Sequence, residues 1–254
     1  MKAYAKANIF LKIVGIDKRG YHLLNSRFIL LENFYDELSL TYEKTQDGFE
    51  IISDFECEDN IIKKAYHLLC KEGFERELEE CFKHLSLKLV KNIPTFAGLG
   101  GGSSDAACFL KMMNEELNLK ISNSKLMQLG LCLGADVPFF LSGFFSANVS
   151  GIGELVKEHE DVIPRLDFSF PNVKCSTKAV YDEFDRGEFD FYENLNLAKN
   201  MQKQSSKKIL EEGQNAILND LFAPCVKIYA DMKEFLDQGY FLSGSGSSVF
   251  KVAQ

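Results

Sequence analysis

The amino-acid sequence predicts an α+β fold built as two closely packed domains. Strand-like and helical segments are mixed along the chain without the steady β-α-β rhythm of a doubly wound sheet. A glycine-rich loop joins a strand to a helix in the first half, whereas short strands lie among helices from about residue 155 onward. The 254 residues, 46% of them hydrophobic and 26% charged, suffice to bury a sizeable core without disulfide or metal staples.

Alternation of apolar and polar residues marks the first strand. Over residues 3–14, Ala5 and Ala7 fall on one face while Lys6 and Asn8 fall on the other, which predicts a half-buried strand. The turn-forming sequence Asp-Lys-Arg-Gly at residues 17–20 ends it. Similar runs predict further strands at residues 27–31, 37–43, 49–52 and 85–89.

Helical spacing of apolar residues predicts the helices. One opens at Asp59-Asn60, and another follows residues 103–105, where Ser-Ser-Asp supplies cap chemistry. A third covers residues 123–133 and ends at Gly134. Beyond residue 155 the patterns predict strands at 166–170, 240–242 and 248–252 and helices near 177–186 and 220–237. A soft boundary divides the chain into predicted domains at 1–153 and 154–254.

Charge and cysteine usage exclude several classes of protein. The chain has 29 basic and 37 acidic residues, a net charge of −8, which argues against a broad electrostatic grip on nucleic acid or an anionic membrane but allows a local cationic pocket. Seven scattered cysteines and four histidines lack metal-ligand spacing. The odd, scattered cysteines indicate reduced core thiols in a cytoplasmic protein rather than a disulfide framework or a zinc site. No membrane span or signal peptide is predicted. The sequence does not predict an oligomeric state.

The glycine-rich loop predicts a phosphate-binding site. Four glycines in five positions free the backbone to approach a ligand, and the following helix directs unpaired N–H groups and about half a positive charge at the same space. A flexible Gly/Ser connector is the alternative, but such linkers lack the flanking strand and helix. The Walker and dinucleotide patterns are both absent. The candidate residues for binding a di- or triphosphate are Pro94, Thr95, Phe96, Ala97, Gly98, Leu99, Gly100, Gly101, Gly102, Ser103 and Ser104, of which the two serines are also candidates for helping to hold Mg²⁺.

For two charged residues, Asp136 and Lys6, the sequence alone leaves a structural and a functional interpretation open. Asp136 follows the predicted helix end at Gly134 and precedes Pro138, which is expected to favour extended geometry before it and to end helical continuation. Its carboxylate can then reach a cleft, although capping of a turn is an equally good account. Lys6 lies in mid-strand, and from the residues alone a solvent-facing lysine is the favoured interpretation.

Five motifs together resemble a known family. The Pro-x-x-x-Gly-Leu-Gly-Gly-Gly-Ser-Ser pattern at residues 94–104 resembles the ATP loop of the GHMP kinases, which include galactokinase, homoserine kinase and mevalonate kinase. Further motifs are similar to the branch that acts on cytidine diphosphate-linked methylerythritol; they lie at residues 5–11 with 20–24, 134–140, 219–221 and 243–250. The similarity spans residues 3–252 in preserved order.

The resemblance implies a fold and a reaction. The expected fold has a ribosomal protein S5 domain 2-like N-terminal domain and a ferredoxin-like C-terminal domain. The expected reaction is ATP-dependent phosphorylation of the C2 hydroxyl of that cytidine compound, in non-mevalonate isoprenoid biosynthesis. Asp136 would be the general base, and Lys6 beside it would keep it ionised and stabilise the nucleophilic oxygen. Mg²⁺ is implied by phosphoryl-transfer electrostatics, without a carboxylate ligand that can be named.

The resemblance also implies substrate contacts. Tyr21 and Tyr181 would sandwich the cytosine, His22 would hydrogen-bond its polar edge, and Asn8 would lie near the diphosphate and polyol. Asn60 would contact adenine, for which a simple helix N-cap is the alternative; half-buried packing is the alternative for the two tyrosines. Rival functions are another GHMP kinase, acting on homoserine, mevalonate or a sugar, and a non-catalytic nucleotide-binding protein. The glycine-serine segment at 243–246 is by sequence a hairpin loop, and the resemblance places it near the substrate.

Overall fold

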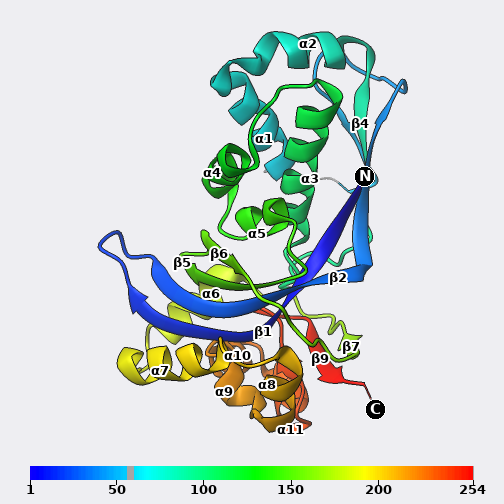
Figure 1. Ribbon diagram of the computed structural model, residues 1–254. Coiled ribbons are helices and arrows are strands. Elements are labelled where there is room, and N and C mark those ends of the chain that lie inside the picture. The colour runs from blue at the N-terminus through cyan, green and yellow to red at the C-terminus, as the bar shows by residue number, and fades with distance from the viewer. Residues whose placement is uncertain (56–59, 254) are drawn as a thin grey trace. The chain divides into compact units, whose positions relative to one another are not determined.

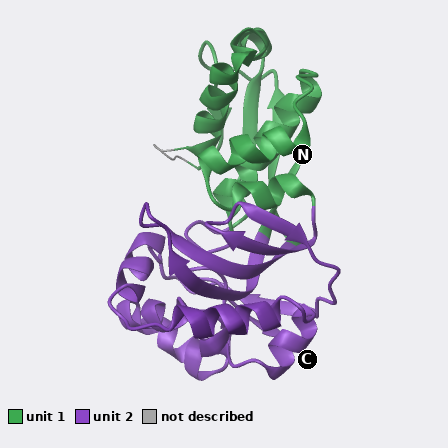
Figure 2. Cartoon of the chain, turned by 60° about the vertical axis from the view of Figure 1, so that its left-hand side comes forward, with its two compact units in different colours: residues 1–5, 31–93, 100–143 green, residues 6–30, 94–99, 144–254 purple. Residues whose placement is uncertain are grey.

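The computed structural model describes residues 1–55 and 60–253. The chain forms two compact units that are interleaved in sequence (Figure 2). Unit 1 comprises residues 1–5, 31–93 and 100–143, and unit 2 comprises residues 6–30, 94–99 and 144–254. Two long strands, β1 (Lys2–Ile16) and β2 (His22–Thr41), pair with each other and contribute to both units. The division into domains at 1–153 and 154–254 stays a prediction.

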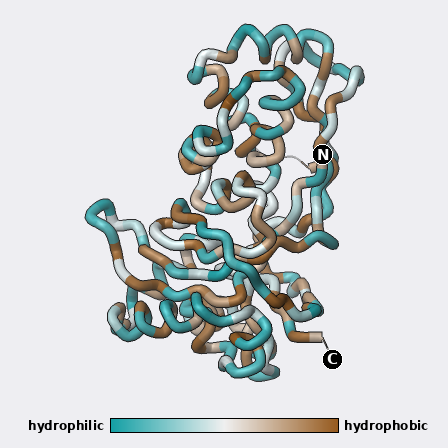
Figure 3. Tube along the Cα trace, in the orientation of Figure 1, coloured by the Kyte–Doolittle hydropathy of each residue, from teal (hydrophilic) through white to brown (hydrophobic). Residues whose placement is uncertain are grey.

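Unit 1 packs helices around the central helix α3. Its sheet combines the end of β2 with β4 (Ser86–Val90), which runs antiparallel to β2, and β3 (Ile51–Ile52), which runs parallel to β4. The helices are α1 (Ile61–Leu69), a π-helical segment (Cys70–Phe74), α2 (Glu75–His84), α3 (Gly101–Glu116), α4 (Asn123–Leu133) and α5 (Val137–Ser142) (Figure 1). Nine residues of α3 are buried, so both α1 and α5 pack against it. Helix α2 is mostly hydrophilic (Figure 3) and buries only Leu78 and Phe82.

Unit 2 contains the remaining strands of the same six-stranded sheet, a separate three-stranded sheet and the remaining helices. The start of β2 pairs with β5 (Ser146–Gly151), which pairs with β6 (Leu155–Glu158). A three-stranded sheet has the order β7 (Leu166–Ser169), β9 (Val249–Val252), β8 (Phe241–Leu242). The helices are α6 (Thr177–Phe184), α7 (Phe191–Met201), α8 (Ser206–Glu212), α9 (Asn215–Leu218), α10 (Phe222–Ile228), a 3₁₀ turn (Ala230–Met232) and α11 (Lys233–Asp237).

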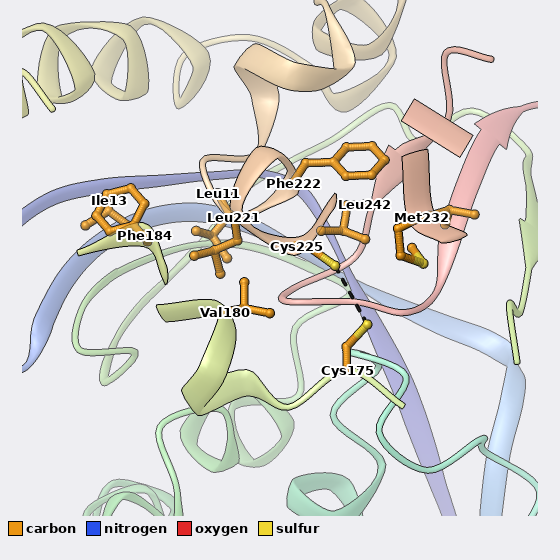
Figure 4. Packing of buried hydrophobic residues seen from close by; sticks show 11 residues of the cluster. Leu11, Ile13, Cys175, Val180, Phe184, Leu221, Phe222, Cys225, Met232 and Leu242 are labelled. Carbon is orange, nitrogen blue, oxygen red and sulfur yellow. Dashed lines mark hydrogen bonds between the residues drawn. The ribbon is translucent and has the colours of Figure 1, made fainter. Parts of the chain in front are cut away.

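A buried apolar cluster forms the core of unit 2. Leu11 and Ile13 of β1 pack with residues of α6, α10 and β8 (Figure 4). The thiols of Cys175 and Cys225 lie within this cluster, with their sulfur atoms 3.7 Å apart. Within the described residues the cysteines are free thiols, as the sequence predicted; Cys57 lies outside them. The prediction that the thiols lie in the core is wrong for Cys132, which is exposed at the end of α4. No helix in the described part of the chain is long and apolar enough to cross a membrane.

Several predicted elements change in the structure. The predicted half-buried first strand is wrong, because β1 is buried on both faces: Lys6 and Lys12 are each only 3% exposed. The two strands predicted at 27–31 and 37–43 are one continuous strand, β2. Strands β5 and β6 and helices α7 to α9 were not predicted. In β5 the apolar residues Ala147 and Val149 do alternate with polar ones, but the strand is only six residues long.

Candidate active site

The glycine-rich loop opens helix α3 earlier than predicted. The helix starts at Gly101, and Gly100 is its N-cap with a left-handed φ of 70°. Ser103, Ser104 and Asp105 therefore lie inside the helix, so the prediction that their side chains cap it is wrong. The first N–H groups of α3 belong to Gly101, Gly102 and Ser103, and such groups have no partner within a helix. Glycine at position 101 allows Ile93 to pack closely there, because an added Cβ would lie 3.1 Å from Ile93 Cγ2. N–H groups at the start of a helix are suited to binding phosphate.

Three segments of unit 1 meet at this end of α3. A Cβ added to Gly102 would lie 3.6 Å from Ile61 at the start of α1. A Cβ added to Gly134 would lie 3.6 Å from the Ser103 hydroxyl and 4.0 Å from Ile61. The start of α1, the start of α3 and the turn that carries Asp136 are therefore neighbours. The loop that the sequence marks for phosphate and the carboxylate that it marks for proton transfer belong to one local structure.

Asp136 occupies the N-cap position of α5, with φ −84° and ψ −17°, and is half-buried. Its side chain makes no capping hydrogen bond to that helix. The expectation that Pro138 ends helical structure is wrong, because this proline stands in the first turn of α5, where its missing N–H costs nothing. Gly134 does end α4, with an extended φ of 176°.

Asn60 begins α1 as a true N-cap. Its Oδ1 accepts a hydrogen bond of 2.9 Å from the Ile62 N–H. The helix N-cap, which the sequence allowed as the alternative to a contact with adenine, is therefore confirmed for the Asn60 side-chain oxygen. Asp59, the other residue of the predicted helix start, lies outside the described residues.

In unit 2, Lys6 is anchored beneath the glycine-rich loop. Its Nζ donates to Asn8 Oδ1 at 2.7 Å and to the Gly98 carbonyl at 3.1 Å, and it lies 4.8 Å from the centre of the Phe28 ring. The Lys6 backbone N–H donates to the Leu99 carbonyl at 2.9 Å. The solvent-facing lysine favoured from the residues alone is thus wrong, and the ammonium is held at the loop backbone.

Asn8 is fixed on the same strand face. Its Nδ2 donates to the Ser26 hydroxyl at 2.9 Å, and that hydroxyl donates in turn to the Phe10 carbonyl. Both ends of the Asn8 amide are therefore engaged, because Oδ1 accepts from Lys6. Lys6 and Asn8 form one rigid polar pair.

The segment 243–248 between β8 and β9 packs directly on the glycine-rich loop. The Ser248 N–H donates to the Ala97 carbonyl at 3.0 Å, and the Ser243 hydroxyl donates to the Gly98 carbonyl at 3.1 Å. Asn219 supports the segment from below, since its Nδ2 donates to the carbonyls of Leu242 and Gly244, each at 2.9 Å. The motifs at 219–221 and 243–250 are therefore parts of one loop-supporting structure. The segment joins antiparallel strands, as the sequence predicted, and also braces the loop.

The residues predicted to bind the pyrimidine fall into two groups. The His22 ring lies 4.8 Å from the Tyr181 ring, tilted by 44°, and His22 Nε2 lies 2.7 Å from Asp185 Oδ1. Tyr21 is 57% exposed, and its ring lies 5.1 Å from the Arg19 guanidinium. Sequence inspection missed Asp185, because nothing about an aspartate four residues after Tyr181 marks it as a partner of His22.

The described residues show which protein groups could hold magnesium. No three His, Cys, Asp or Glu side chains gather among them. Magnesium keeps several waters and binds phosphate oxygens through few protein ligands, so this donor set fits an ion that arrives with a nucleotide. The Ser103 hydroxyl, one of the two serine donors considered from the sequence, lies beside Gly134.

The fold and the glycine-rich loop at the start of α3 match those of the GHMP kinases. A family model described as the GHMP kinases N terminal domain matches residues 60–144. A 4-diphosphocytidyl-2-C-methyl-D-erythritol kinase of Campylobacter jejuni is 60% identical over 99% of each chain, and one of Sulfurimonas denitrificans is 44% identical over 100% of this chain and 96% of its own.

Solved structures show the same relationship. The crystal structure of a 4-(cytidine 5'-diphospho)-2C-methyl-D-erythritol kinase is 28% identical, with a TM-score of 0.73 over 100% of this chain and 90% of that chain. A mevalonate kinase structure, 13% identical with a TM-score of 0.69 over 100% of this chain and 91% of its own, shares the fold. The chain belongs to the GHMP kinases, in the branch formed by the 4-diphosphocytidyl-2-C-methyl-D-erythritol kinases.

Proposed function

We propose that this protein phosphorylates the C2 hydroxyl of 4-diphosphocytidyl-2-C-methyl-D-erythritol with ATP, in non-mevalonate isoprenoid precursor biosynthesis. The observation that carries the proposal is the meeting of the α3 N-terminus with the Asp136 turn, in a chain 60% identical to kinases bearing that name. The net charge of −8 is compatible with two phosphate-bearing ligands, because backbone N–H groups and a helix end supply much of the grip.

In the proposed reaction, Asp136 accepts the proton of the C2 hydroxyl as the hydroxyl oxygen attacks the γ-phosphorus of ATP. The bond between the γ-phosphorus and the β,γ-bridging oxygen breaks, and ADP leaves. The N–H groups at the start of α3 hold the phosphates, and Lys6 stabilises the developing negative charge on the attacking oxygen. Magnesium, when bound with ATP, supplies charge neutralisation between the β- and γ-phosphates. General-base assistance of this kind contributes ~10²–10⁴ in rate.

Recognition of the cytidine compound is assigned to β1, the turn after it, and α6. Tyr21 and Tyr181 stack on the cytosine, His22 contacts its polar edge, and Asn8 lies near the diphosphate and polyol. Asn60 contacts the adenine of ATP through the part of its amide that does not cap α1. Stacking on an aromatic ring contributes ~1–3 kcal/mol per base.

A substrate panel tests the function. The purified protein is incubated with Mg-ATP and, separately, with the cytidine compound, mevalonate, phosphomevalonate, homoserine or galactose, and ADP is measured. Release of ADP with the cytidine compound alone is expected. If ADP is released only with another alcohol, the protein is still a GHMP kinase but the cytidine compound is not its substrate. If ADP is released with none of these compounds, a non-catalytic nucleotide-binding protein is favoured.

Two variants test the assigned roles. Asp136→Asn and Lys6→Met are each expected to lower kcat at least ~100-fold while ATP affinity changes little. Lys12→Met is the matched control for Lys6, because Lys12 lies on the same strand, is also 3% exposed and pairs with Asp220. If folded Lys12→Met shows a comparable fall in kcat, the effect of Lys6→Met would come from losing a buried ammonium on this strand in general and not from a catalytic role of Lys6.

A further inference from the structure

Three charged side chains are buried together in unit 1, beneath the ends of the glycine-rich loop. Asp36 lies on β2, Lys91 directly follows β4, and Asp105 lies in the second turn of α3. The side chains are 0%, 10% and 5% exposed, respectively. Lys91 Nζ donates to Asp105 Oδ2 at 2.7 Å and also to Asp36 Oδ2. A single ammonium therefore links two carboxylates that come from different elements.

The cluster fixes the residues just before the loop. Asp36 Oδ1 accepts hydrogen bonds from the backbone N–H groups of Asn92, at 2.6 Å, and Ile93, at 2.8 Å. Hydrogen bonds to a charged acceptor are shorter and stronger than neutral ones. Asp36 thus fixes the backbone position of Ile93, the residue before Pro94.

The same cluster fixes the residues just after the loop. Asp105 belongs to α3, which opens at Gly101. A Cβ added to Gly101 would lie 3.1 Å from Ile93 Cγ2 and 3.6 Å from Lys91 Nζ. The two ends of the loop therefore lie side by side, and the ammonium of Lys91 lies directly under the point where α3 begins.

We propose that Lys91, Asp36 and Asp105 form a positioning clamp that closes the base of the nucleotide loop and thereby sets the affinity for ATP. The proposal rests on the proposed function, because it concerns the same nucleotide site. Lys91 acts through the loop backbone and is a positioning residue. Its ammonium also places a positive charge between the two carboxylates.

The energetics favour a geometric role over a purely stabilising one. Buried ion clusters are often no more stabilising than well-packed apolar side chains, whereas their directional bonds fix positions. Asp105 Oδ1 is buried and accepts no hydrogen bond from the described residues. Burial, which outweighs the attraction of Lys91, raises the pKa of Asp105 to about 7. A cluster with one unsatisfied carboxylate oxygen contributes less stability than a fully bonded one.

Direct nucleotide binding separates this proposal from the proposed function. The full chain is titrated with Mg-ATP in a calorimeter without any alcohol substrate, and kcat and both KM values are measured with the cytidine compound. For Lys91→Met we expect the Kd for ATP to rise roughly 10- to 100-fold. The KM for the alcohol should stay within about twofold, and Lys91→Arg should recover part of the lost affinity.

Two further variants keep the test decisive. Lys88→Met removes an exposed ammonium from β4 that lies 3.7 Å from Glu43, and it should leave the Kd for ATP unchanged. If Lys91→Met does not fold, Asp105→Ala breaks the link to α3 while Lys91 stays paired with Asp36, and it should weaken ATP binding about 10-fold. Unchanged ATP affinity in folded Lys91→Met or Asp105→Ala would overturn the clamp. Absence of ATP binding by the unaltered protein would instead overturn the proposed function.

Discussion

Replacement of Gly98 by alanine tests whether the glycine-rich loop and the segment 243–248 are built against each other. Gly98 has a φ of +71°, and an added Cβ would lie 2.2 Å from the Ser243 carbonyl oxygen and 3.0 Å from that of Gly246. Both obstacles are backbone atoms, which cannot rotate away, so one segment must move by roughly 1 Å. The left-handed conformation costs ~1–2 kcal/mol for a non-glycine residue, and such overpacking costs a further ~1–3 kcal/mol.

Gly239→Ala is the matched control. Gly239 has a φ of +78° in the same unit, and an added Cβ there meets nothing within 4 Å. It therefore carries the backbone strain of Gly98→Ala without the clash. Urea unfolding should show that Gly98→Ala lowers the free energy of unfolding ~1–3 kcal/mol more than Gly239→Ala does.

Activity should separate the two variants further. A 1 Å displacement near a reacting phosphate costs up to ~100-fold, so kcat/KM should fall by that order for Gly98→Ala and stay near the unaltered value for Gly239→Ala. Free energies of unfolding that agree within ~0.5 kcal/mol, together with equal kcat/KM values, would refute the reasoning that the two segments are in contact.

Three other outcomes follow from named contacts. Gly102→Ala should be at least as stable as the unaltered protein, because position 102 is helical and the added Cβ would meet only Ile61, at 3.6 Å. Its KM for ATP should nevertheless rise, because the methyl group blocks the approach of phosphate to the helix start. An unchanged KM would mean that phosphate does not approach Gly102. Arg27→Met should lower the free energy of unfolding in urea by ~3–5 kcal/mol, since Arg27 is fully buried and its Nη1 lies 3.0 Å from buried Asp161; a loss below ~1 kcal/mol would contradict this. The raised pKa of Asp105, about 7 against an ordinary 3.8, means that the native state keeps a proton that the unfolded chain has lost, so its contribution to stability is present at pH 4 and is lost as pH rises through 7. Relative to Asp105→Asn, the free energy of unfolding of the unaltered protein should therefore fall by up to ~1.4 kcal/mol per pH unit between pH 4 and 7. Parallel curves of unfolding free energy against pH for the two proteins would refute this.

Much of the local structure could be predicted from the sequence. Strand β4, helix α4 with its end at Gly134, and the strand–loop–helix arrangement around the glycines all follow from periodicity and capping chemistry, which act over a few residues. Motif order identified the family, because glycines at fixed spacing before an apolar helix have few uses other than holding phosphate. Lys6 and Asp136 came from the resemblance, and their catalytic roles stay predictions.

Tertiary structure alone decided what surrounds those motifs. The contacts around these motifs connect residues that are far apart in the chain. Buried Lys6 bonds Gly98, Lys91 bonds Asp36, and the Ser243–Gly98 hydrogen bond spans 145 positions. Local propensity carries no information about such pairs, because their geometry is set by which elements pack together. The sequence by itself therefore determined that this chain carries a phosphate loop with a candidate base, and the fold decided which carbonyls, carboxylates and ammonium groups hold that loop in place.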